Sequence, residues 1–167
     1  MRLIPNRIDD FFRDQKNNKL LNYGLLFFAV ILFSWWSNPE LTPSISPDTW
    51  EYIDIAKDFS DPAHEIRPFF YPLMIRACML VSTNHWAEVL VCLQIILHCI
   101  TIVVLYHLYL KLNISKNISI VFALAIGFNP NLLYYSSCIL TQQILGVLIA
   151  LTTYFSVELI RTWKVDI

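Results

Sequence analysis

Eighteen consecutive residues, from Leu20 to Ser37, carry no charged side chain. As an α-helix with a rise of about 1.5 Å per residue, this run nearly matches the hydrocarbon core of a bilayer, which is roughly 30 Å thick. Trp35 and Trp36 stand near its end, and tryptophan favours the level of the lipid headgroups. The run therefore predicts a helix that crosses a membrane.

Three further apolar runs follow, and the composition agrees with them. Of the 167 residues, 56% are hydrophobic and only 15% are charged, which is too little charge to cover a water-soluble domain of this size. Pro130 lies inside the third run, where the loss of a backbone donor bends or ends a helix. We expect an all-α polytopic transmembrane protein with about four spanning helices, at residues 20–37, 87–110, 118–136 and 139–160.

Lysine and arginine predict the orientation. Five lie in residues 1–19, two in the 111–117 turn and two near the C-terminus, against three in the long segment 38–86. By the positive-inside rule, the tail 1–19 is cytoplasmic and 38–86 is an outer loop. The spacing of Ile4, Ile8, Phe11 and Phe12 also predicts a short interfacial helix in the tail. The formal net charge of −1 gives no basic field that would attract nucleic acid.

The outer loop is acidic and carries the candidate functional residues. Ser46-Pro47-Asp48 is typical of a helix start and predicts a helix running to Phe59. Asp48 can act as a general base or help to hold a divalent cation, and its alternative role is a helix-capping charge. Arg67 precedes prolines and aromatics, where it either binds phosphate or anchors the chain at the interface. Residues 67–80 predict a second helix on or in the bilayer surface.

The order of these residues resembles a known family. Pro47-Asp48-Thr-Trp-Glu51-Tyr52 followed by Arg67-Pro68-Phe-Phe-Tyr71-Pro72 is similar to the first outer loop of the C-type membrane glycosyltransferases. This superfamily includes protein O-mannosyltransferases and the bacterial aminoarabinose transferase. The stretch from Phe128 to Gln142 resembles the family's next outer corner. Gln142 replaces the usual glutamate there, and Phe69 replaces a proline.

The resemblance implies a partial or truncated enzyme that transfers a hexosyl or pentosyl group from a polyprenyl-phosphate donor to an acceptor at the outer face. Asp48 would be the catalytic base, and the substrate would be bound by Glu51, Tyr52, Arg67, Tyr71 and Gln142. A divalent cation is a possible cofactor, although the sequence shows no His/Asp/Glu cluster that requires one. The membrane would be the bacterial inner membrane, and the missing C-terminal part of a split or longer enzyme would be a partner.

A non-enzymatic membrane protein, either an inactive remnant or an assembly subunit, is the alternative. A small transporter fits poorly, because the spans have no central charge and no inverted repeat. His98 and His107 are nine residues apart and fall on opposite helix faces, so they predict packing or interhelical hydrogen bonds and no shared metal. The four cysteines form no C-x-x-C pair and predict no redox or metal site.

Overall fold

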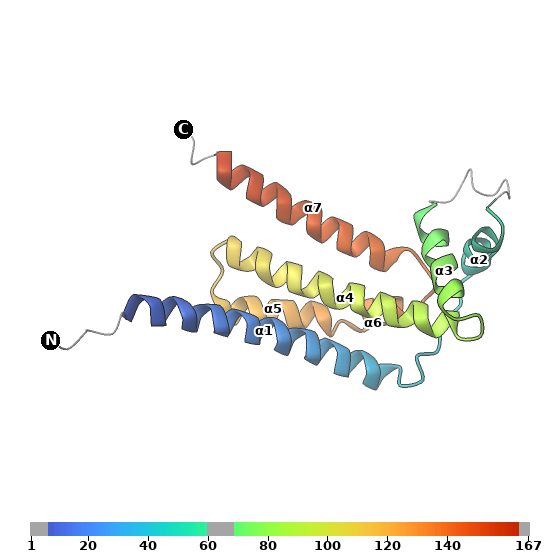
Figure 1. Cartoon of the computed structure of the whole chain (residues 1–167), viewed down its shortest axis with the longest axis horizontal. Coiled ribbons are helices and arrows are strands. Elements are labelled where there is room, and N and C mark those ends of the chain that lie inside the picture. The colour runs from blue at the N-terminus through green and yellow to red at the C-terminus, as the bar shows by residue number, and fades with distance from the viewer. Residues whose placement is uncertain (1–6, 60–68, 164–167) are drawn as a thin grey trace.

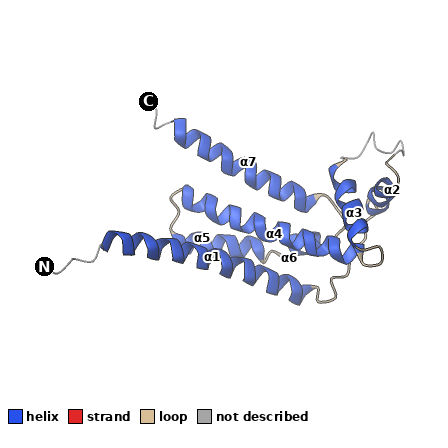
Figure 2. Cartoon of the chain, in the orientation of Figure 1, coloured by secondary structure: helices blue, strands red, loops and turns tan. Residues whose placement is uncertain are grey.

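The computed structural model describes residues 7–59 and 69–163, and side chains from Leu20 onward. In this part of the chain all regular structure is helical (Figures 1 and 2). The expected fold class, an all-α polytopic membrane protein, is confirmed. The helices are α1 (Arg7–Ser37), α2 (Thr49–Lys57), α3 (Phe70–Val81), α4 (Trp86–Lys111), α5 (Lys116–Gly127), α6 (Pro130–Ser137) and α7 (Gln142–Trp163).

Helices α1, α4, α5 and α7 run back and forth along one axis, and α2 and α3 lie together at one end (Figure 1). We call this the α2–α3 end. It also holds the end of α1, the start of α4 and the corner between α6 and α7. The opposite end holds the start of α1, the turn between α4 and α5 and the end of α7. This alternation agrees with the order of spans that the sequence predicts.

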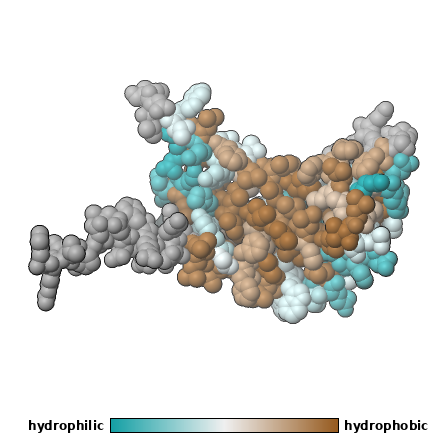
Figure 3. Space-filling model, viewed as in Figure 1, coloured by the Kyte–Doolittle hydropathy of each residue, from teal (hydrophilic) through white to brown (hydrophobic). Residues whose placement is uncertain are grey.

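Three helices are long and apolar enough to span a membrane: the Leu20–Ser37 part of α1, then α4 and α7. The pair α5 and α6 would add a fourth span and is bent by 51°. The predicted effect of Pro130 is confirmed, since it begins α6 directly after the break. The side chain of Asn129 caps this new start by accepting from the backbone N–H of Asn131 at 3.0 Å. On the face shown in Figure 3, a broad apolar band crosses the bundle between two hydrophilic ends.

Helix α4 lies at the centre and packs against α1, α3, α5, α6 and α7. Its buried residues join the main core cluster, which is formed by Leu26, Val30, Val91, Ile95, Cys99, Ile102, Tyr106 and Ala123. The expectation that the two histidines of α4 make interhelical hydrogen bonds is confirmed. His98 is buried and its Nε2 lies 3.1 Å from the carbonyl oxygen of Gly127, and His107 Nδ1 lies 2.7 Å from the Tyr23 hydroxyl. Both contacts join α4 to another helix.

Several predicted boundaries were wrong. The tail does not form a separate short helix, because α1 continues unbroken from Arg7, and no proline or glycine occurs between Arg7 and the first span to interrupt it. Helix α2 begins at Thr49 and ends at Lys57, two residues short of the predicted Phe59. The last span begins at Gln142 instead of residue 139, because the backbone of Cys138 and Ile139 pairs with another segment.

Candidate functional site

Asp48 lies in a fixed turn at the start of α2. The Ser46 N–H donates to Thr49 Oγ1 at 2.9 Å, and the Thr49 N–H donates back to the Ser46 carbonyl at 3.0 Å. These reciprocal bonds close the turn Pro47–Asp48 just before the helix, with φ −75° and ψ −15° at Asp48. The Asp48 side chain is exposed beside the positive end of the α2 dipole. The backbone that carries this carboxylate is therefore fixed at the surface of the α2–α3 end.

The start of α2 is hydrogen-bonded to the corner between α6 and α7. Thr49 Oγ1 donates to the Ile139 carbonyl at 3.3 Å. The N–H of Ser44 donates to the Ser137 carbonyl at 2.9 Å, and the N–H of Ile139 donates to the Ser44 carbonyl at 3.2 Å. These two backbone bonds form a parallel bridge between Ser44 and Cys138. The turn that carries Asp48 is thus positioned by residues about ninety positions later in the sequence.

Tyr52 of α2 and Tyr71 of α3 meet in a second core cluster. They are only 5% and 1% exposed, and their rings meet edge to face with centroids 5.2 Å apart. Burial raises the pKa of Tyr71 far above its ordinary value, so its hydroxyl stays protonated and can donate. The two rings hold α2 against α3. Both rings face the protein interior. Their predicted contact with substrate stays a prediction.

Gln94 forms hydrogen bonds with Tyr71 and with the corner between α6 and α7, and it was not predicted from the sequence. It is fully buried in α4, and its Oε1 accepts the Tyr71 hydroxyl at 3.0 Å. Its Nε2 donates to the Cys138 carbonyl at 2.7 Å and to the Ser136 carbonyl at 3.2 Å. A lone amide inside an apolar run was the available signal, since a polar side chain in a span needs a partner. Gln94 links α3, α4 and the corner that fastens α2.

Arg76 was also missed, and it closes the other end of α2. Its Nη1 donates to the carbonyls of Ala56 at 3.0 Å and Lys57 at 2.9 Å. A guanidinium there satisfies carbonyls that the helix leaves without an internal partner and complements the negative end of the helix dipole. Both ends of α2 are therefore held by specific bonds.

The remaining predicted site residues either lie away from Asp48 or fall outside the described residues. Glu51 is exposed in the first turn of α2, one turn beyond Asp48. Arg67 lies outside the described residues, so its predicted approach to Asp48 stays a prediction. Gln142 begins α7 and lines a cavity of about 250 Å³ that also includes His98 and Thr101. Asp48 does not line this cavity.

A polar cavity lies at the end of α1. It has a volume of about 380 Å³ and shares Ser44 and Ser137 with the bridge described above. Its other polar walls are Ser37, Asn38 and Thr42, and the Asn38 side chain both donates to and accepts from the Thr42 backbone. This cavity lies beside the hydrogen-bonded segment that precedes Asp48.

No ligand set for a metal emerges among the described side chains of residues 20–59 and 69–163, because no three His, Cys, Asp or Glu side chains there come close enough to bind one ion. The possible divalent cation therefore has no assigned ligands.

The fold defines the class of the protein as an all-α polytopic membrane protein. Comparison with protein-family models, curated proteins and solved structures finds no match for the chain.

Proposed function

We propose that the chain is a membrane glycosyltransferase of the C-type that transfers a sugar from a polyprenyl-phosphate donor to an acceptor at the α2–α3 end. The observation that carries this proposal is the exposed carboxylate of Asp48 in a turn fastened on both sides. Its turn is closed by Ser46 and Thr49 and is bonded to Ile139. A positioned carboxylate is what a general base requires, because geometry comes before pKa in proton transfer.

In the proposed reaction, Asp48 takes a proton from the hydroxyl or amine of the acceptor while that atom attacks the anomeric carbon of the sugar. The bond between this carbon and the phosphate oxygen breaks, and the lipid phosphate leaves with the bonding electrons. Arg67, which follows α2 in the sequence, would stabilise the charge that develops on the departing phosphate. Glu51 would contact the acceptor from the next turn of α2.

The test is transfer from a radiolabelled polyprenyl-phosphate sugar in membranes that contain the full chain. We expect Asp48→Asn to lower transfer by about 100-fold or more, since general base catalysis contributes roughly 10²–10⁴-fold. Asp54→Asn is the matched control, because Asp54 is exposed on α2 and forms an ion pair with Lys57 at 3.5 Å. Equal transfer by the wild type and Asp48→Asn would remove Asp48 from the mechanism.

A non-enzymatic assembly subunit is the second candidate, and the burial of Tyr52 and Tyr71 favours it. Two of the residues that the family resemblance assigns to substrate are used for packing. In this case, membranes containing the wild-type chain would transfer no more label than membranes without it. The same assay therefore separates the two candidates.

A further inference from the structure

A continuous apolar groove runs along the membrane-embedded part of α1, α4 and α7. One half has a volume of about 390 Å³ and reaches Phe27 and Ile100. The other half has a volume of about 300 Å³ and reaches His107 and Tyr154. Both halves share Tyr23, Val103 and Val104, so they form a single groove that extends about two turns along α4. We call it the α1–α7 groove.

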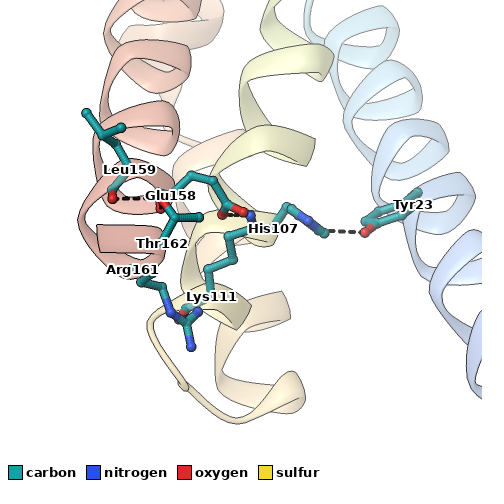
Figure 4. A network of polar contacts seen from close by, with 7 residues as sticks. All are labelled: Tyr23, His107, Lys111, Glu158, Leu159, Arg161 and Thr162. Carbon is teal, nitrogen blue, oxygen red and sulfur yellow. Dashed lines mark hydrogen bonds and ion pairs between the residues drawn. The ribbon is translucent and has the colours of Figure 1, made fainter. Parts of the chain in front are cut away.

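The groove changes character at the opposite end of the bundle. There Tyr23 crosses from α1 to meet His107 at 2.7 Å (Figure 4). The ring of Tyr154, from α7, lies 5.6 Å from the His107 ring between centroids. The Lys111 ammonium sits over the same Tyr154 ring, 4.5 Å from its centroid, in a cation–π contact. Aromatic and cationic side chains thus replace the aliphatic walls.

Among the side chains that the structure describes around Tyr154, charge is unbalanced. Glu158 forms an ion pair with Lys111, and the exposed Arg161 donates to the Lys111 carbonyl (Figure 4). In the described part of the chain, Arg161 forms no ion pair with a carboxylate. One carboxylate therefore faces two permanent cations, with His107 one turn from Lys111 on the same face of α4.

We propose that the α1–α7 groove binds one anionic phospholipid, with an acyl chain along Val103 and Val104 and the phosphate at Arg161 and Lys111. Charge complementarity selects the occupant. The described side chains form a net positive cluster beside Tyr154, which lines the groove. Such a cluster attracts a lipid with net negative charge, and arginine holds phosphate through two donors at once. A zwitterionic lipid of the same chain length brings its own ammonium group, which the cluster repels. This site is independent of the proposed transferase function.

The test measures thermal unfolding of the full chain in detergent micelles doped with phosphatidylglycerol or with phosphatidylcholine of identical chains. At ten times its Kd, phosphatidylglycerol should raise the unfolding midpoint by roughly 3–6 °C, and phosphatidylcholine should not. Soluble glycerol phosphate, which has no chains, should also leave the midpoint unchanged. An equal rise with phosphatidylcholine or with glycerol phosphate would overturn the proposal.

Two matched pairs of variants locate the site. A Cβ added at Gly24 or at Gly146 meets no atom within 4 Å, but only Gly24 lines the groove. Gly24→Phe should therefore abolish the response to phosphatidylglycerol, while Gly146→Phe keeps it. Arg161→Gln should likewise abolish the response, while Lys57→Gln, at the α2–α3 end, keeps it. A full response in Gly24→Phe or in Arg161→Gln would contradict the proposed site.

Discussion

Gln94 is the residue that links α3 and α4 to the corner between α6 and α7 by side-chain hydrogen bonds. Its amide joins the Tyr71 hydroxyl on one side to the carbonyls of Ser136 and Cys138 on the other. In an apolar interior a group left without a partner cannot turn to water instead, so one such residue can fix how three helices meet.

Replacing Gln94 by leucine should therefore destabilise the protein although the new residue is apolar. We expect the unfolding free energy to fall by about 2 kcal/mol, because the Tyr71 hydroxyl and two carbonyls lose their partner. Unfolding in mixed micelles with increasing dodecyl sulfate measures this change. Ile96→Leu, at an exposed position on the same helix, is the control and should have almost no effect. Similar values for both variants would contradict the role of Gln94.

Cys78 gives a prediction about pH. Burial raises the pKa of this thiol above its ordinary value of 9.0. The unfolded chain therefore loses this proton at a lower pH than the folded chain, and deprotonation favours unfolding. Stability from this group is complete well below pH 9.0 and declines as the pH rises above it.

We expect the unfolding free energy of Cys78→Ala to decline less steeply above pH 9.0, by up to about 1.4 kcal/mol per pH unit. Ile75→Val, which removes one buried methylene from the same helix, should keep the wild-type slope. Thermal unfolding from pH 7 to pH 10 compares the three proteins. Parallel curves for Cys78→Ala and the wild type would exclude the thiol as a source of the pH dependence.

The part of the candidate site that depends on local sequence could be predicted, and the rest could not. Ser46, Pro47 and Asp48 predict a helix start because capping uses only neighbouring residues. The bonds from Gln94 to Cys138 and from Thr49 to Ile139 join positions far apart in the sequence. No pattern of spacing reveals such pairs, so the fastening of Asp48 and the burial of Tyr71 emerged only from the structure.

At the scale of elements, α1 and α5 approach closely because Gly127 has no side chain. A Cβ added at Gly127 would lie 2.8 Å from Cγ2 of Val30, a residue that is fully buried. Small residues allow this kind of helix contact in membranes.

Gly127→Ala should lower the unfolding free energy by about 1–3 kcal/mol, because Val30 has no space into which to move. The double variant Gly127→Ala with Val30→Ala should recover part of this loss, and a double-mutant cycle in micelles measures the coupling. Gly146→Ala is the control and should be neutral or stabilising, since its Cβ meets nothing within 4 Å. A coupling energy near zero would show that the two helices do not meet as described.

The spans could be predicted from hydropathy, but their ends could not always be. Residues 20–37 and 87–110 match the helices closely, because a bilayer demands continuous apolar helix. The last span was expected from residue 139, where the apolar run begins. The bridge between Ser44 and Cys138 keeps that backbone extended, and hydropathy carries no information on such pairing.

For the whole molecule, the positive-inside rule predicts that the α2–α3 end faces outward. We expect a membrane-impermeant maleimide added to intact cells to label Asn84→Cys, in the loop before α4, and not Ser115→Cys, in the turn before α5. Three of the four native cysteines are buried, and the wild type gives the background. Permeabilised cells should label both variants. The reverse pattern would place Asp48 in the cytosol and remove the proposed acceptor site.

The bond between Ser44 and Ser137 closes a loop over 93 positions. A ribosome adds α2 early but adds its anchoring corner only after α3, α4, α5 and α6 have emerged. During biosynthesis the turn with Asp48 therefore cannot form these bonds until the chain has been synthesised through Ile139. The proposed acceptor site around Asp48 can therefore reach its final structure only after most of the chain has been synthesised.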